Sequence, residues 1–321
     1  MRARLPVGLA VLAAVCMLAQ PASAAPARAP LPELTLSDVT HTRYAFVGES
    51  ERSIRFCERT HNRGSGGTRR RLHNIMALVG PGVTKVVARR DVPRLPGTAD
   101  ARRGRHFSHR GCGRGDAVPL NVPPGAYEVQ ICADQALRQR NVNNNCYIRD
   151  KAFFVIKRDW TGTASGEAPL VTSPTANETW QSATVSYRFQ AATNASAGQF
   201  AYSFFAGGVG NVNYQVSGNI LDCTAAGGAT FQPDFGKLEM DYAKEHYTLV
   251  GEIPVRSEIP ITMTCPEQTI PAVALAVNPF LTNGGTDGFT NALPFGTRVL
   301  TGTYLVSASG VQKYRSTWTL R

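Results

Sequence analysis

The stretch from Tyr127 to Cys146 reads YEVQICADQALRQRNVNNNC, and it is the clearest guide to how this chain folds. Tyr127, Val129 and Ile131 alternate with polar residues or cysteine, which is the pattern of a strand with one buried face. The strand follows Pro123-Pro124-Gly125, a run of turn-forming residues. Cys132 and Cys146 then enclose a polar run that ends in three asparagines. We predict a hairpin, with a disulfide between these two cysteines because both lie at its ends.

Further short strands are expected on both sides of this hairpin. Alternating or apolar β-type runs occur at 33–36, 54–56, 72–79, 83–87, 118–122 and 152–156. Residues 93–115 are basic, rich in glycine and expected to form one or two loops. No long window keeps the 3.6-residue period of a substantial helix. About seven short strands with turns between them are typical of an immunoglobulin-like β-sandwich, which we predict for residues 32–158.

This first half resembles the CARDB-type domains, which are immunoglobulin-like, cell-adhesion-related modules of secreted bacterial proteins. Their last hairpin has a similar Y-x-V-x-x-C-A-D pattern and an asparagine-rich loop before a second cysteine. The N-R-G-S-G-G segment at 62–67 stands where these modules carry an N-x-G-x-x loop. The resemblance covers about residues 32–157 and implies an adhesion-type binding role. The family's last loop tends to be acidic, but this chain has Gln139 and Val142 there, so no cation site is expected.

The second half also reads as β-structure. Residues 159–176 are predicted to form a linker, or a linker followed by a first edge strand. Alternation at 184–189, 212–217, 299–306 and 314–320 predicts antiparallel strands with one solvated face. We therefore expect a second all-β domain, a sandwich or a barrel, over residues 177–321. This part resembles an uncharacterised secreted bacterial β-domain that carries cysteines at the places of Cys223 and Cys265.

The N-terminal end has the features of an export signal. Arg2 and Arg4 precede an apolar run from Val7 to Leu18, and Ala22-Ser23-Ala24 is a small-residue cleavage site. A membrane anchor would need about 20 apolar residues, and this run is shorter. Residues 1–24 are therefore predicted to be a signal peptide, and the product is expected to be secreted, free or bound to the cell surface.

Six cysteines remain after the predicted signal peptide, and an even number in an exported chain predicts three disulfides. Six cysteines allow 15 pairings. Four of them precede Trp160, so Cys223 is expected to pair with Cys265 if the two halves fold separately. The hairpin bridge between Cys132 and Cys146 then leaves Cys57 to pair with Cys112.

Positive charge is concentrated in the first half. Residues 25–160 contain 24 Lys and Arg against 12 Asp and Glu, whereas residues 161–321 contain 8 against 11. Most of these cations are arginines, whose planar fork of donors matches sulfate, phosphate and carboxylate groups. The candidate contacts for a polyanion lie in glycine-rich connections, and they are Arg69, Arg70, Arg71, Arg102, Arg103, Arg105, Arg110 and Arg114. The alternative is that these clusters are only solvated loops.

Signs of catalytic chemistry are sparse. The chain has no G-x-S-x-G elbow, no H-E-x-x-H and no P-loop. His106 and His109 have neither the helical nor the strand spacing of a metal pair, and His246 stands alone in the second half. Glu239 and Asp241 share a strand face, as two solvated carboxylates also would. No catalytic residue, metal or cofactor is predicted.

Three hypotheses follow for the function. The first is a secreted or surface-associated binding protein whose basic first domain contacts an anionic polymer, either an acidic glycan or an envelope phosphate polymer. Nucleic acid is disfavoured because Phe107 is the one aromatic residue among the arginine runs, which leaves little for base stacking. The second is a structural or protein-interaction component of the cell envelope. The third is a hydrolase with its site in the second domain.

Overall fold

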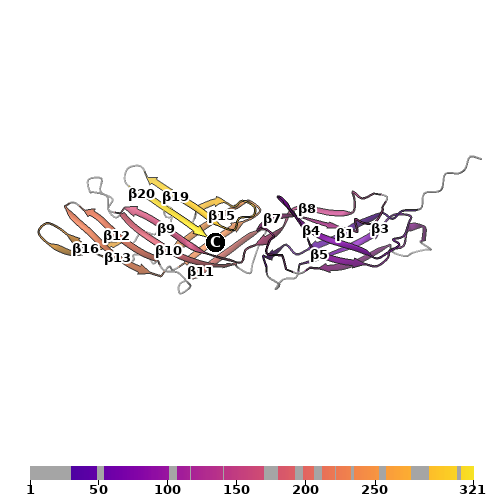
Figure 1. Ribbon diagram of the computed structural model, residues 1–321, viewed down its shortest axis with the longest axis horizontal. Helices are drawn as coiled ribbons and strands as arrows, with labels where there is room; N and C mark the ends of the chain where they lie inside the picture. The colour runs from indigo at the N-terminus through magenta and orange to yellow at the C-terminus, as the bar shows by residue number, and fades with distance from the viewer. Residues whose placement is uncertain are drawn as a thin grey trace, which may run out of the picture.

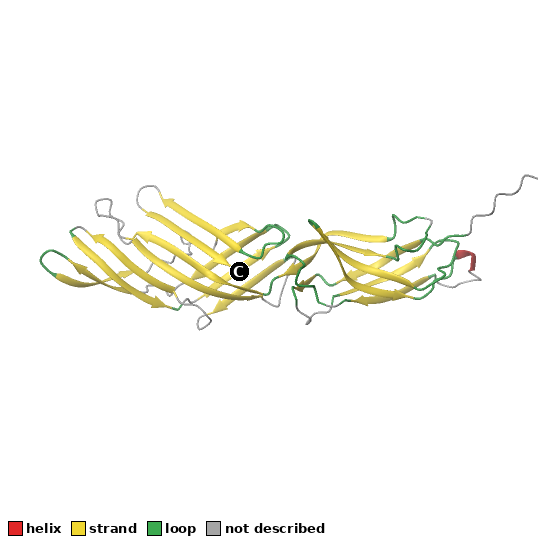
Figure 2. Ribbon diagram, viewed as in Figure 1, coloured by secondary structure: helices red, strands yellow, loops and turns green. Residues whose placement is uncertain are grey.

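The structure is a computed structural model, and it describes residues 30–48, 54–100, 107–115, 117–139, 141–169, 180–191, 198–205, 212–220, 222–232, 235–252, 258–275, 289–308 and 312–321. Two strand-rich units follow one another along the long axis of an elongated molecule (Figure 1). Strands dominate throughout, and the described helical structure is one short turn, η1 (Thr98–Asp100) (Figure 2). The predicted all-β class is confirmed. The predicted signal peptide, residues 1–24, lies outside the described residues.

All three predicted disulfides are present. They join Cys57 to Cys112, Cys132 to Cys146 and Cys223 to Cys265. Three such bridges fit an oxidising, extracellular environment. No helix within the described ranges is long and apolar enough to cross a membrane.

The first sheet has eight strands in the order β1-β3-β6-β5-β4-β7-β8-β2. A single residue pair, Arg89 with Arg114, joins β5 to β6. Core side chains from β3 on one side and from β4, β7 and β8 on the other pack together, so the sheet folds over itself into a sandwich. Its strands are β1 (Leu34–His41), β2 (Tyr44–Phe46), β3 (Arg55–Asn62), β4 (Leu72–Gly80), β5 (Val83–Val92), β6 (Ser108–Arg114), β7 (Gly125–Cys132) and β8 (Cys146–Ile156).

Strand β6 corrects the expectation that residues 93–115 form loops, because residues 108–114 are paired with β3 along their length. Glycine is common in loops, but here it leaves the inner face of a strand without side chains. A Cβ at Gly111 would come within 2.8 Å of the Arg90 guanidinium, and one at Gly113 within 2.4 Å of the Phe56 ring. Bulky side chains of other strands therefore fill the space that the glycines leave.

Strand β8 joins the two units because both faces of its last four residues, 153–156, are buried. Phe153 and Val155 belong to the core of the sandwich, whereas Phe154 and Ile156 belong to the core of the second unit. The Phe154 ring packs edge-on against Phe200, with ring centroids 6.1 Å apart. Successive side chains of a strand point to opposite faces, so one strand can serve two cores.

The second sheet has twelve strands, and all its described pairings are antiparallel. The strands are β9 (Asp159–Pro169), β10 (Trp180–Ala191), β11 (Gln199–Phe205), β12 (Val212–Ile220), β13 (Cys223–Phe231), β14 (Phe235–Asp241), β15 (His246–Glu252), β16 (Glu258–Thr264), β17 (Thr269–Leu275), β18 (Phe289–Ala292), β19 (Leu300–Ala308) and β20 (Gln312–Leu320).

Strand β9 occupies most of the segment that was predicted as a linker. It pairs with β10 on one side and with β20 on the other, so it is not an edge strand either. Its small residues suit this central place: a Cβ at Gly162 would come within 2.0 Å of the Thr319 carbonyl oxygen. Only Lys157 and Arg158 separate β8 from β9. Residues 170–176 of the predicted linker lie outside the described residues.

The second core is rich in aromatic residues, and several of their polar atoms are hydrogen-bonded. The Tyr202 hydroxyl donates to the Lys157 carbonyl oxygen (2.8 Å), and the Trp318 indole N–H donates to the Tyr247 hydroxyl (2.9 Å). The chain end returns to the start of β9, where Arg321 and Thr161 exchange two backbone hydrogen bonds. These hydrogen bonds fix the orientation of the buried Tyr202 and Trp318 rings in the core.

The shared strand makes a prediction about stability. Phe154→Ala should lower the free energy of unfolding by about 3–4 kcal/mol, because a buried ring is removed from the second core and leaves a cavity. Ile148→Ala on the same strand is the control: Ile148 is 57% exposed and its loss should cost less than about 0.5 kcal/mol. Urea denaturation of both variants measures the difference, and equal costs would contradict the shared core.

Candidate functional site

Five arginines lie on the outer face of β3, β6 and β5. Along β3 the buried residues alternate with Arg55, Cys57 and Arg59, and along β6 the glycines alternate with Arg110, Cys112 and Arg114. The strand pairing places Arg55 opposite Arg114 and Arg59 opposite Arg110. Arg89 of β5 stands beside Arg114. We call this surface the arginine face, and it consists of Arg55, Arg59, Arg89, Arg110 and Arg114.

A disulfide divides the arginine face into two rows. Cys57 and Cys112 are directly opposite each other between the Arg55–Arg114 pair and the Arg59–Arg110 pair. The bridge locks the relative position of the two strands. Arg55 also donates from Nη2 to Cys112 Sγ (3.2 Å). The spacing of the four arginines on β3 and β6 is therefore set by the backbone and by the disulfide.

The positive charge of this face is only partly compensated. Arg59 forms an ion pair with Asp38 (3.0 Å). Among the described residues, no acidic side chain lies within ion-pair distance of Arg89, Arg110 or Arg114. Like charges directly opposite on neighbouring strands destabilise a sheet. An anion that bound between these arginines would relieve that repulsion.

His61 extends the face beyond Arg59. Its Nε2 is 2.8 Å from the Ser37 hydroxyl oxygen. Burial, followed by the charges of Arg63 and Arg59, lowers the pKa of His61. Burial and the two arginines thus disfavour the protonated imidazole, and a bound anion would offset the effect of the arginines.

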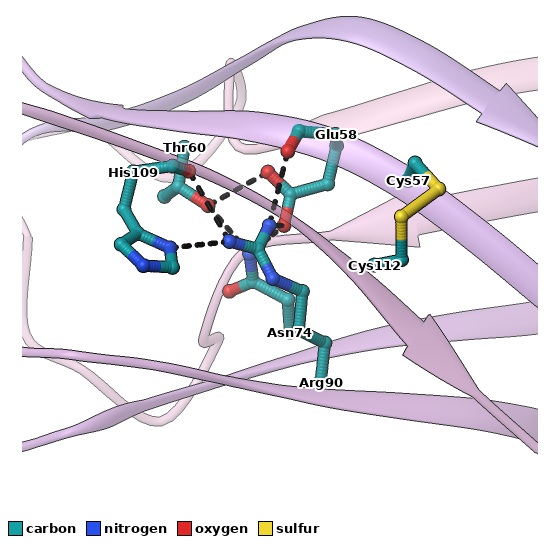
Figure 3. Close-up of polar contacts among 7 residues, drawn as sticks. All are labelled: Cys57, Glu58, Thr60, Asn74, Arg90, His109 and Cys112. Carbon is teal, nitrogen blue, oxygen red and sulfur yellow. Dashed lines mark hydrogen bonds and ion pairs between the residues drawn. A yellow bond between two sulfur atoms is a disulfide. The ribbon is translucent and has the colours of Figure 1, made fainter.

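Behind the arginine face lies a buried polar network (Figure 3). Arg90 points inward from β5 and forms an ion pair with the Glu58 carboxylate of β3. Asn74 Nδ2 donates to Glu58 Oε1 and to Thr60 Oγ1, at 2.8 Å each, and Thr60 donates to Glu58 Oε2 at 2.8 Å. Arg90 Nη2 lies 2.6 Å from His109 Nδ1. Since arginine can only donate, His109 accepts at Nδ1.

The network ties together the strands that carry the arginine face. Glu58, Thr60 and Asn74 are fully buried and Arg90 nearly so. A buried charge is tolerated when it is paired and hydrogen-bonded, and the Glu58 carboxylate has three side-chain partners here. Strands β3, β4, β5 and β6 all contribute, so the network holds the two layers of the sandwich together beneath the exposed arginines.

Of the five predicted contacts that the structure describes, Arg110 and Arg114 lie on the arginine face. Arg69, Arg70 and Arg71 lie in the segment that leads into β4, apart from the arginine face in the strand register. Arg70 is held by an ion pair with the buried Asp134 (3.1 Å). The other three predicted arginines, Arg102, Arg103 and Arg105, lie outside the described residues.

Sequence reasoning assigned no binding role to Arg55, Arg59 or Arg89. The available signal was alternation: R-x-C-x-R at 55–59 and R-x-C-x-R at 110–114 repeat one spacing in two segments that pair. Strand pairing between distant segments was the missing information. The basic runs follow one another along the chain, whereas the arginine face is formed by residues that neighbour one another across strands.

The acidic residues noted in the second half also come together. Asp241 is opposite His246 and Glu239 is opposite Thr248, and the four line a hollow of about 460 Å³ on β14 and β15. Asp241 has a structural role, because it accepts hydrogen bonds from the Lys244 backbone N–H (2.9 Å) and from Gln199 (3.3 Å). In the described part of the chain, no three His, Cys, Asp or Glu residues are arranged to hold a metal ion.

No protein-family model matches this chain, and neither a curated protein nor a solved structure matches it. The CARDB resemblance therefore stays a prediction from the sequence, and the candidate site depends on the geometry above.

The buried network should be sensitive to the loss of one partner. Arg90→Met should lower the free energy of unfolding by about 3–5 kcal/mol, because it leaves the Glu58 carboxylate buried and unpaired. Adding Glu58→Leu should recover part of this loss. Arg89→Met, on the exposed side of the same strand, is the control and should change stability little. Urea denaturation measures all four proteins, and a double variant less stable than Arg90→Met would argue against this role.

Asp241 predicts a pH dependence in the second unit. Burial acts to raise the pKa of Asp241, but hydrogen bonds from Lys244 and Gln199 and the Lys244 charge outweigh it, so the net shift is downward from 3.8. The resulting stabilisation is present above pH 3.8 and is lost as the pH falls through the lower, folded-state pKa. Asp241→Asn should therefore cost about 1–2 kcal/mol at pH 7 and progressively less in acid.

Chemical denaturation at several pH values tests this. Glu239→Gln is the matched control, since Glu239 is an exposed carboxylate on the same strand. A deficit for Asp241→Asn that is constant between pH 7 and strong acid would contradict the assignment.

Proposed function

We propose that this protein is a non-catalytic polyanion-binding protein, and that the arginine face of its first sandwich is the binding surface. The observation that carries the proposal is the placement of five arginines in neighbouring positions across β3, β6 and β5, four of them without an acidic partner among the described residues. Arginine forks bind sulfate, phosphate and carboxylate groups through two hydrogen bonds. The first sandwich is proposed to be a CARDB-like, adhesion-type module.

The dimensions of the face favour a polymer over a single ion. Opposed side chains on neighbouring strands are about 5 Å apart. Arg55 and Arg59, like Arg110 and Arg114, are four residues apart, which corresponds to about 13 Å along a strand. A chain that carries an anionic group on successive units can contact both rows at once, whereas one small anion cannot.

The residues between the arginines favour an acidic glycan or an envelope phosphate polymer over nucleic acid. The outward positions of β3 and β6 hold arginine, cysteine, His61 and Ser108, without a Phe, Tyr or Trp between them. Single-stranded nucleic acid is usually held by stacking of bases on aromatic side chains, and this surface offers none of those three. The predicted signal peptide and the disulfides support action outside the cytoplasm.

A salt-gradient experiment on the full chain tests the proposal. The protein, produced in an oxidising compartment, is applied to an immobilised sulfated glycan beside a face variant and a control variant. The face variant carries Arg89→Ser, Arg110→Ser and Arg114→Ser. The control carries Arg69→Ser, Arg71→Ser and Arg94→Ser, which removes the same charge from exposed positions elsewhere.

We expect the wild type and the control to be retained past physiological salt and the face variant to elute well before them. Each lost phosphate- or sulfate-type contact reduces the salt dependence of binding by about one unit of slope. Equal shifts in both variants would mean that net charge alone causes retention. A larger shift in the control would move the site to the loop before β4, and no retention of any protein would favour the alternative of a structural or protein-interaction module.

A further inference from the structure

A second charged cavity lies where the two units meet. It measures about 500 Å³, and residues from both units line it. The first unit contributes the turn between β1 and β2 and the middle of β8. The second contributes the start of β11 and the turn before β15. Cavities of this size hold compact organic ligands in many proteins. None of the residues of the arginine face lines it.

A bulge in β8 shapes one wall of this cavity. Tyr127 pairs with Phe153 and Val129 pairs with Arg149, so three residues of β8 stand opposite Glu128 alone. Lys151, in the middle of the bulge, has a left-handed backbone with φ of 45°. Bulges commonly re-aim side chains beside functional sites. Here the bulge takes Lys151 out of the regular ladder, and its side chain reaches Ala243 and Glu245 of the second unit.

Lys151 forms an ion pair that connects β8 with the second unit. Its ammonium group donates to Glu245 Oε1 (2.8 Å) and to the Ala243 carbonyl oxygen (3.3 Å). Glu245 also has a left-handed backbone, with φ of 59°. Non-glycine residues in this conformation are strained and persist where the surrounding structure requires them. These contacts join the two units at one rim of the cavity.

The remaining cations of the wall are available to a ligand. Arg43 and Arg149 are exposed, and neither has a hydrogen-bond or ion-pair partner for its side chain among the described residues. His41 Nδ1 lies 2.8 Å from the Thr42 carbonyl oxygen, so Nδ1 carries the proton and Nε2 is left to face the cavity or solvent. Asp150 is the one acidic residue in the lining. The balance of charge is positive.

The floor of the cavity is apolar. Tyr44, Phe154 and Phe200 form it, with Tyr44 packed edge-on against Phe200 at 5.5 Å between ring centroids. Gly198 allows this arrangement, since a Cβ there would come within 2.6 Å of the Phe154 ring. Cations above an apolar floor suit a molecule with an acidic group on a compact ring.

We propose that this junction cavity binds a small organic anion, a ring compound that carries a carboxylate or sulfate group, with Arg43 and Arg149 on the acidic group and the apolar floor under the ring. This site is separate from the arginine face and does not depend on the function proposed for it. Because both units line it, the ligand would also reinforce their contact.

His41 provides an independent readout. Burial, followed by the charges of Arg149 and Arg43, lowers the pKa of His41. The groups near the imidazole are Arg43 from the turn, Arg149 and the Tyr147 ring from β8, and the Thr42 carbonyl oxygen. An anion between the two arginines would favour the imidazolium form. The complex would then hold more proton than the free protein, so affinity should rise as the pH falls below 7.

Isothermal titration calorimetry of the full chain tests the proposal with benzoate and phenyl sulfate as probes. Benzyl alcohol supplies the ring without the charge, and inorganic sulfate supplies the charge without the ring. The variants are Arg43→Gln, Arg149→Gln and His41→Gln, and Arg69→Gln is the control for loss of one exposed arginine. Near-ultraviolet circular dichroism confirms that each variant keeps its tertiary structure.

We expect at least one of the two ring anions to saturate a single site, and each arginine variant to weaken it about tenfold or more, as for the loss of a charged hydrogen bond. Binding of benzoate but not phenyl sulfate would assign a carboxylate ligand, and the reverse a sulfate. His41→Gln should abolish the pH dependence. The proposal is overturned if neither ring anion saturates, if benzyl alcohol binds equally well, or if Arg69→Gln weakens binding as much as the cavity variants.

Discussion

The two-sided burial of β8 is the constraint on which this molecule depends. Phe153 and Val155 complete the core of the sandwich, and the intervening Phe154 and Ile156 complete the core of the twelve-stranded unit. A strand with both faces buried cannot rotate or slip in register without exposing one set of side chains to water. With only Lys157 and Arg158 before β9, the two units share apolar packing as well as a covalent connection.

The rigidity of the sandwich matters for the arginine face. Five like charges on three neighbouring strands repel one another, so the strands must be held in place against this repulsion. The Cys57–Cys112 bridge fixes the outer side, and the network around Glu58 and Arg90 fixes the inner side. The glycines at 111 and 113 connect these features, because their small size lets Arg90 and Phe56 approach β6 from within. The same strands therefore carry the arginines on their exposed face and the polar network on their buried face.

The junction shows how irregular backbone can create a cavity between regular sheets. Two residues with left-handed backbone, Lys151 and Glu245, meet there in an ion pair, and Lys151 is placed by the bulge of β8 opposite Glu128. A third such residue, Asp38, binds Arg59 at the arginine face. Each described non-glycine residue with positive φ thus takes part in an ion pair beside one of the two proposed sites.

Sequence alone determined the all-β class, the three disulfides and the excess of positive charge in the first half, because alternation, cysteine parity and charge are local properties of the chain. It also indicated β7 and its hairpin. It did not reveal that β6 is a strand, because in the sequence a glycine that faces a bulky side chain of another strand cannot be told from a glycine in a loop. It did not reveal that residues 159–169 form a central strand, because small residues that allow close packing between strands have the same composition as a linker.

The arginine face and the junction cavity were decided by tertiary structure. Arg55, Arg89 and Arg114 are far apart along the chain, and only the β3-β6-β5 order places them together. Likewise, Arg43 and Arg149 become neighbours of Phe200 only because β8 contributes to both cores. Which distant segments pair depends on the burial of whole sheet faces, a property of the folded molecule that no single stretch of sequence contains.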